Sequence, residues 1–93
     1  MLKVNEYFDG NVKSIAFKTA TLPATVGVMA PGDYVFNTAD KEAVTVISGA
    51  MTIKLPGETG PRTIQAGESF NVAANCAFDV SIDSDTAYLC LYG

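Results

Sequence analysis

The stretch GDYVFNTADKEAVTVISG, from Gly32 to Gly49, decides how the rest of the chain is interpreted. Its first part, Asp33–Phe36, is short and contains two aromatic residues, which is typical of a strand. A polar turn, Asn37–Lys41, follows it, and Glu42–Ser48 is rich in β-branched residues. Gly49 ends this second strand with a residue that suits a tight hairpin. The stretch therefore predicts two strands joined by a polar turn.

Strand signals also dominate the rest of the chain. Further short runs rich in β-branched or aromatic residues are Val12–Phe17, Thr25–Met29, Ala50–Leu55, Ser69–Ala73, Ala77–Ile82 and Thr86–Tyr92. Turn-forming glycines and prolines separate them. No segment keeps an apolar helical period over the length of an average helix, and only a short helical turn near Ala39–Glu42 is compatible with the sequence. We expect an all-β protein, with residues 1–93 forming one closed or nearly closed barrel or sandwich.

The composition limits the classes of function. A chain of 93 residues supports one core, and six Lys or Arg against ten Asp or Glu give a net charge of −4. This balance argues against binding to nucleic acid or to an anionic membrane. Neither a secretory signal nor a membrane span is recognisable, so we expect a cytoplasmic protein. We expect Cys76 and Cys90 to be reduced packing residues; a redox-reactive thiol would need a neighbouring base, which the sequence does not indicate.

Two segments resemble the motifs of the cupin superfamily. Glu42 is followed by six residues and then Gly49, as at the end of the first cupin motif, where two histidines normally stand just upstream. Here the upstream residues are Phe36–Ala39, and the chain contains no histidine. Gly67–Val72 resembles the start of the second motif, with Phe78 at the place of a third histidine. The resemblance implies a small cupin-like barrel (a double-stranded β-helix or jelly roll) with no metal and no other cofactor.

Five segments, in order along the chain, resemble a narrower family, the small cupin-type pyrimidine/purine nucleoside phosphorylases. They are NEYFDGNVKSIAF (Asn5–Phe17), VGVMAPGDYVFNT (Val26–Thr38), VTVISGAMTIKLPG (Val44–Gly57), AGESFNV (Ala66–Val72) and AYLCLY (Ala87–Tyr92). The resemblance implies an enzyme of broad specificity that cleaves purine and pyrimidine nucleosides with inorganic phosphate. The products would be a free base and a pentose 1-phosphate.

Glu42 is the leading candidate for a catalytic group. Cleavage of this kind is expected to pass through an oxocarbenium-like transition state, and phosphate itself is the nucleophile. A carboxylate can stabilise positive charge on the sugar or bind the ribose hydroxyls. Thr38 is a second catalytic candidate. Thr38 and Asn37 stand at the positions where cupins carry metal-binding histidines, and there they could bind sugar or phosphate. The alternative for Glu42 is a solvated side chain at the start of a strand. The alternative for Asn37 and Thr38 is that they are turn residues whose side chains hydrogen-bond to the local backbone.

Five further residues are candidates for substrate binding. Tyr34 and Phe36 alternate along one strand, so both are expected to face the barrel interior, where stacking would suit broad specificity. Asn71 and Phe78 belong to the second motif, and Tyr88 lies in the last strand. Core packing is the alternative for the aromatic residues, and the sequence leaves open which way Asn71 faces.

Lys41 and Arg62 are the candidates for phosphate binding. Lys41 is adjacent to Glu42, and Arg62 ends the loop that begins at Gly57 and has the bidentate geometry that suits phosphate. Ordinary surface charges are the alternative. Members of the family often carry a proline at the position of Ala73 and a basic residue at that of Leu91. If the basic residue contacts phosphate in the family, the departure at Leu91 leaves phosphate binding, or its location, open.

The sequence thus predicts a metal-independent nucleoside phosphorylase. We expect a homodimer, because small barrels have strand edges that need covering. The main alternative is a degenerate cupin that binds a small sugar or metabolite without turning it over. A metal-dependent cupin enzyme is the least consistent, since the chain lacks histidine.

Overall fold

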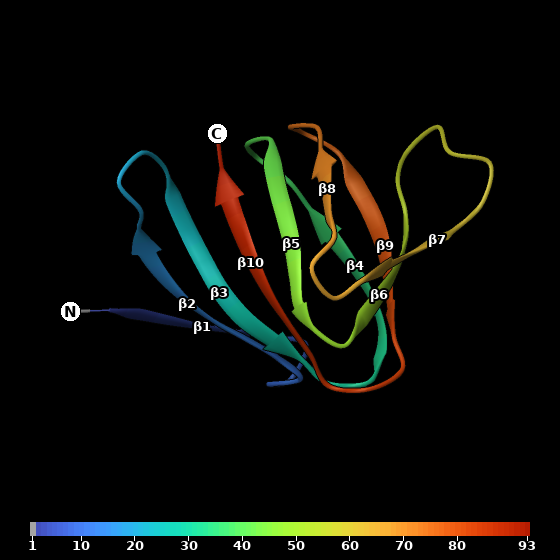
Figure 1. Ribbon diagram of the computed structural model, residues 1–93, viewed down its shortest axis with the longest axis horizontal. Helices are drawn as coiled ribbons and strands as arrows, with labels where there is room; N and C mark the ends of the chain where they lie inside the picture. Colours follow the sequence, from blue (N-terminus) through green and yellow to red (C-terminus); the bar gives the residue numbers. More distant parts are fainter. Residues whose placement is uncertain (1) are drawn as a thin grey trace.

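The computed structural model describes residues 2–93, which form ten strands in two antiparallel sheets (Figure 1). The strands are β1 (Lys3–Tyr7), β2 (Val12–Lys18), β3 (Pro23–Met29), β4 (Gly32–Asn37), β5 (Glu42–Ser48), β6 (Ala50–Lys54), β7 (Arg62–Gln65), β8 (Ser69–Val72), β9 (Ala77–Ile82) and β10 (Thr86–Tyr92). Nowhere in the described part of the chain is there a helix long and apolar enough to cross a membrane. The all-β prediction is confirmed.

The two sheets face each other across one interior. The larger sheet has the strand order β1-β2-β3-β10-β5-β8, and the smaller has the order β4-β9-β6-β7. The predicted pair β4 and β5 therefore lies in two different sheets, and the turn between them crosses from one sheet to the other. This turn lies at the same end of the molecule as the end of β10, at the top of Figure 1.

Eight strands lie where the sequence predicts them, and three of these, β5, β9 and β10, have the predicted bounds. Two strands were not predicted. β1 is an edge strand whose side chains are mostly exposed, so its sequence lacks the alternation of a half-buried strand. β7 has only four residues. The helical turn that the sequence allows near Ala39–Glu42 does not form: Ala39 and Asp40 form a bend, and Glu42 begins β5.

The core lies between the sheets and follows from alternation along the strands. In β9, Phe78, Val80 and Ile82 are buried. In β6, Met51 and Ile53 are almost completely buried. Each such side chain stabilises the fold by about 1.5–3 kcal/mol.

Strand register brings the inner residues of β5 and β10 together. In this antiparallel pair Glu42 is opposite Tyr92, Val44 is opposite Cys90, and Val46 is opposite Tyr88. All six residues lie on the face that looks into the interior, because strand residues two apart share a face. The carboxylate, the thiol and the two phenols are therefore neighbours on one wall.

Candidate functional site

A cavity of about 320 Å³ lies between the two sheets. Its apolar lining includes Met29, Phe36, Met51 and Phe78, and the exposed residues Asn37, Ala39 and Asp40 lie at its rim. Its polar side chains come from Tyr7, Ser14, Asn37, Asp40, Glu42, Tyr88, Cys90 and Tyr92. A largely apolar cavity with a few converging polar groups is typical of a small-molecule site.

Glu42 is the half-buried acid of this cavity. The Cys90 thiol donates a hydrogen bond to Glu42 Oε1 at a distance of 3.4 Å. Burial raises the pKa of the Glu42 carboxyl above its ordinary value; the bond from Cys90 opposes this rise, and the nearby charge of Asp40 adds to it. Glu42 Oε2 has no hydrogen-bond partner among the described residues, so this oxygen is available to a ligand.

Tyr88 reaches its position because a glycine faces it. Gly27 lies between Ser14 on β2 and Tyr88 on β10 in the strand register. A Cβ atom at Gly27 would lie 2.7 Å from both the Tyr88 hydroxyl and the carbonyl oxygen of Lys13. Only glycine therefore leaves room for the Tyr88 side chain to lie across β3 towards Ser14.

The Tyr88 hydroxyl remains a hydrogen-bond donor at neutral pH. Burial raises its pKa to about 12; the charge of Cys90 adds to this rise, and a hydrogen bond with Ser14 opposes it. Because the phenol stays protonated, it presents a neutral donor to the cavity. Its place in the cavity lining is consistent with a binding role for Tyr88, which the sequence left open.

Cys90 and Tyr92 complete the polar wall. Burial raises the pKa of the Cys90 thiol to about 12, with a further contribution from Glu42, so the thiol is not activated as a nucleophile. Cys76 is also a free cysteine, and these findings support the prediction of reduced packing residues. The Tyr92 hydroxyl and the Thr25 hydroxyl share a hydrogen bond of 2.9 Å. Tyr92 thus has the structural partner expected of a buried tyrosine.

Phe36 and Phe78 form an aromatic wall of the cavity, on the smaller sheet and opposite the polar wall of β5 and β10. Their ring centroids lie 5.9 Å apart, and Phe8, in the turn after β1, packs edge-on against Phe36 at 5.5 Å. Phe8 has a φ of 54°, a strained value for a bulky residue, which its contacts with Phe36 and Tyr34 help to maintain. The turn after β1 therefore packs against the aromatic wall through Phe8 and supports the position of Phe36.

The cavity brings together half of the predicted site residues. Glu42, Asn37, Phe36, Phe78 and Tyr88 all line it, although they come from four different strands. This shared lining supports the interpretation of the opening stretch as one wall of a pocket.

Two predicted residues are near the cavity but are engaged elsewhere. The buried Thr38 hydroxyl donates to the Ala73 carbonyl oxygen at 2.7 Å and accepts from the Cys76 amide at 3.1 Å. This favours the alternative of a residue that satisfies the local backbone. Tyr34 faces the interior as predicted, but its hydroxyl donates to the Ala30 carbonyl oxygen at 2.6 Å. Neither residue lines the cavity.

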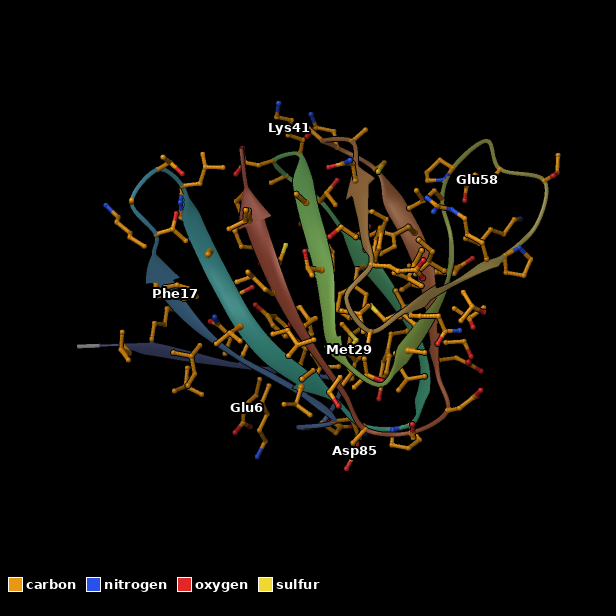
Figure 2. All side chains as sticks on the ribbon, in the orientation of Figure 1. Glu6, Phe17, Met29, Lys41, Glu58 and Asp85 are labelled. Atoms are coloured by element: carbon orange, nitrogen blue, oxygen red, sulfur yellow. The ribbon has the colours of Figure 1, made fainter. Side chains whose placement is uncertain are left out.

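Three predicted residues lie outside the cavity. Asn71 is exposed on β8, and with Lys41 and Leu91 it lines a second hollow at the start of β5, which has only Glu42 in common with the cavity. Leu91 faces away from the cavity, so the departure from the family pattern at this position lies outside it. Arg62 begins β7, and its Nε lies 3.3 Å from Glu58 Oε2. Figure 2 shows Glu58 well apart from Lys41, so Lys41 and Arg62 do not form one phosphate site.

Five polar lining residues were not among the predicted site residues. They are Tyr7, Ser14, Asp40, Cys90 and Tyr92. Ser14 follows Val12 on the buried face of β2, and a buried hydroxyl between apolar neighbours is a signal that the alternation could have given. Tyr7 ends the unpredicted strand β1, so the sequence offered no comparable signal for it.

Residues 2–93 contain no group of three or more His, Cys, Asp and Glu side chains placed to hold a metal ion. Metal independence itself stays a prediction.

Comparison with known sequences points to one family. The model of a family described as pyrimidine/purine nucleoside phosphorylase matches residues 2–92. A pyrimidine/purine nucleoside phosphorylase of Magnetococcus marinus is 61% identical over 93 residues and covers 100% of both chains. Another from Pseudomonas putida is 60% identical over 92 residues, which are 99% of this chain and 98% of the relative.

Solved structures agree on the fold. A crystal structure of a protein of unknown function from Vibrio parahaemolyticus has a TM-score of 0.95 at 43% identity, covering 100% of this chain and 99% of the other. An RmlC-like cupin from Shewanella frigidimarina has a TM-score of 0.76 at 16% identity, covering 98% of this chain and 82% of the other. The predicted cupin fold is therefore confirmed.

Proposed function

The chain belongs to the pyrimidine/purine nucleoside phosphorylase family, and we propose that its reaction takes place in the cavity that contains Glu42. The protein is an enzyme that joins inorganic phosphate to the pentose of purine and pyrimidine nucleosides and releases the free base. The alternative of a binding module without catalysis is set aside, because full-length relatives at about 60% identity carry the name of the enzyme.

Glu42 would act on the sugar. In the reaction a phosphate oxygen forms a bond to the anomeric carbon, and the bond from that carbon to the base nitrogen breaks with its electron pair on the base. Positive charge develops on the sugar ring as this bond lengthens. A carboxylate in a partly desolvated cavity stabilises such a charge more strongly than one in water does. Its unpaired oxygen, Oε2, would bind a ribose hydroxyl or face the ring.

The aromatic wall would hold the base. Phe36 and Phe78 present faces and edges against which purines and pyrimidines can both pack, since every base has a π-face. Asn37 at the rim and the Tyr88 hydroxyl inside would supply the directional hydrogen bonds. Packing against rings with few directional contacts is consistent with acceptance of both base classes.

The test compares base release with and without phosphate. Wild-type protein should release uracil from uridine and adenine from adenosine only when phosphate is present. Glu42→Gln should lower kcat by about tenfold or more, the scale seen when one electrostatic site group is removed. Glu58→Gln is the matched control, because Glu58 pairs with Arg62 in the β6–β7 loop, and it should retain wild-type kcat. Equal kcat for Glu42→Gln and wild type would remove Glu42 from the mechanism.

A second copy of the chain would pack on the outer face of the larger sheet. Val4, Ile15, Val26 and Leu89 are consecutive partners across β1, β2, β3 and β10. The first three are 61%, 38% and 38% exposed, and the exposed Phe17 and Val28 extend this apolar face. An apolar sheet face can pack against a copy of itself, so a two-fold axis through it would let two copies cover each other.

The homodimer is tested by introducing a lysine on the outer face of each sheet in turn. Val26→Lys should convert a dimer to a monomer in light scattering coupled to size exclusion. Val35→Lys is the control, because Val35 is 54% exposed but lies on the outer face of the smaller sheet. A monomeric wild-type protein, or equal behaviour of the two variants, would contradict this interface. The cytoplasmic location stays a prediction, which cell fractionation would check.

A further inference from the structure

The ionisable side chains that face the cavity are all acids. They are Tyr7 from β1, Asp40 from the β4–β5 turn, Glu42 from β5, and Tyr88, Cys90 and Tyr92 from β10. The other strands that line the cavity contribute apolar side chains together with Ser14 and Asn37. These strands are β2, β3, β4, β6, β8 and β9. A doubly charged anion in this cavity would therefore face two carboxylates and no positive side chain of the described residues.

Phosphate has two forms near neutral pH, and they differ in what they offer these acids. The dianion carries one hydroxyl and two negative charges, whereas the monoanion carries two hydroxyls and one charge. A hydroxyl of phosphate can donate a strong hydrogen bond to a carboxylate, which turns repulsion into attraction. The cavity has the matching groups: the Glu42 Oε2 oxygen and the exposed Asp40 carboxylate accept, while the phenol of Tyr88 donates.

We propose that the enzyme binds phosphate in the cavity as the monoanion, with a phosphate hydroxyl donating to the Glu42 or Asp40 carboxylate. This deepens the proposed function and depends on it. Lys41 lies exposed outside the cavity beside Glu42, where it attracts both forms of phosphate to the mouth but does not offset the charge of the dianion inside the cavity.

The chemical step balances with this form of phosphate. The attacking oxygen bonds to the anomeric carbon, and the departing base takes the electron pair of the broken carbon–nitrogen bond. One phosphate proton passes through solvent to the base nitrogen, and the carboxylate that accepts the phosphate hydrogen bond keeps its negative charge. The pentose 1-phosphate keeps the other proton, and no atom is oxidised or reduced. The monoanion thus carries in the proton that the base needs in a chain without histidine.

The test is the dependence of the phosphate KM on pH, with uridine saturating, between about pH 5.5 and about pH 8.5. The KM for total phosphate should rise about tenfold per pH unit above the second pKa of phosphate, while kcat and the uridine KM change little. A phosphate KM that is flat, or that falls as pH rises, would overturn the proposal. Base release that never depends on phosphate at any pH would instead overturn the proposed function.

Sulfate gives an independent readout, because it is a dianion with no proton to donate at these pH values. Sulfate should not compete with phosphate in wild-type enzyme, and competition at concentrations near the phosphate KM would overturn the proposal. Asp40→Asn and Glu42→Gln place an amide donor where a carboxylate stood, so at least one of them should become sensitive to sulfate and lose the rise of KM with pH. If neither does, the carboxylates do not discriminate, and the proposal fails.

Two matched variants separate discrimination between the phosphate monoanion and dianion from a general effect of protein charge on phosphate binding. Lys41→Gln should raise the phosphate KM by a similar factor at every pH, leaving the shape of the profile unchanged. Asp79→Asn removes an exposed carboxylate from the outer face of the smaller sheet and should leave both the profile and the sulfate response as in wild type. A flattened profile in Asp79→Asn would contradict a local role for the cavity acids.

Discussion

Replacing Gly27 by alanine tests how the larger sheet shapes the cavity. The new Cβ would lie 2.7 Å from the Lys13 carbonyl oxygen, 2.7 Å from the Tyr88 hydroxyl and 2.8 Å from Tyr88 Cζ. Ordinary van der Waals contacts begin near 3.4 Å, so β2 or the Tyr88 ring must move by several tenths of an ångström. Overpacking of this kind costs about 1–3 kcal/mol. Because alanine also restricts the unfolded chain, which contributes about 0.4–1 kcal/mol in the other direction, we expect a net loss of about 1–2 kcal/mol.

The same displacement should reduce activity. Tyr88 lines the cavity, and a shift of its ring moves both the ring and the hydroxyl relative to the substrate. We expect kcat/KM for uridine to fall about tenfold, since misplacement by 1 Å can cost up to about a hundredfold. Urea denaturation followed by far-ultraviolet circular dichroism gives the free energy of unfolding, and phosphate-dependent uracil release gives the kinetics.

Gly60→Ala is the control for the effect of adding a methyl group to a glycine. A Cβ at Gly60 would meet nothing within 4 Å, and the residue does not require a positive φ. Its free energy of unfolding should stay within about 0.5 kcal/mol of wild type. If Gly27→Ala were as stable and as active as Gly60→Ala, Gly27 would not set the position of Tyr88.

Three further predictions separate structural from functional residues. Thr38→Val leaves the Ala73 carbonyl and the Cys76 amide without their side-chain partner, so the free energy of unfolding should fall by about 1–3 kcal/mol while kcat stays within about twofold of wild type. Phe36→Leu should raise the KM for both uridine and adenosine by about tenfold or more and leave the phosphate KM unchanged, because one base-stacking contact contributes about 1–3 kcal/mol. Burial raises the pKa of the Cys90 thiol from 9.0 to about 12, so the folded state holds this proton more tightly than the unfolded state. The associated stability is present below pH 9.0 and is lost as pH rises towards about 12; Cys90→Val should show a shallower alkaline loss in urea midpoints, and an unchanged slope would contradict this origin.

The sequence predicts the fold well because the core depends on local alternation. Phe78, Val80 and Ile82 are buried as their spacing in β9 predicts. β1 escaped prediction because it lies at a sheet edge and buries little of its sequence. Alternation of apolar and polar residues reveals a strand that is buried on one face, so it cannot identify a strand whose two faces are both exposed.

The candidate site is less predictable because it depends on long-range register. Glu42, Phe36 and Asn37 lie within the opening stretch, and the motif alone indicated them. The pairing of Tyr88 with Gly27, and of Gly27 with Ser14, joins β10 to the hairpin of β2 and β3, which is distant from it in sequence. Thr38 occupies a position that suggests a ligand, but its hydroxyl is used by the backbone at Ala73 and Cys76, a contact that no local pattern contains.

The central claim is that the cavity between the sheets holds the sugar beside Glu42. The most direct measurement is a crystal structure with phosphate and a nucleoside analogue whose carbon–carbon glycosidic bond cannot be cleaved. We predict density for the pentose inside the cavity, with a ribose hydroxyl or the ring oxygen facing Glu42 Oε2 and the base against Phe36. Ligand density confined to the hollow formed by Lys41 and Asn71, or to the outer face of either sheet, would contradict the claim.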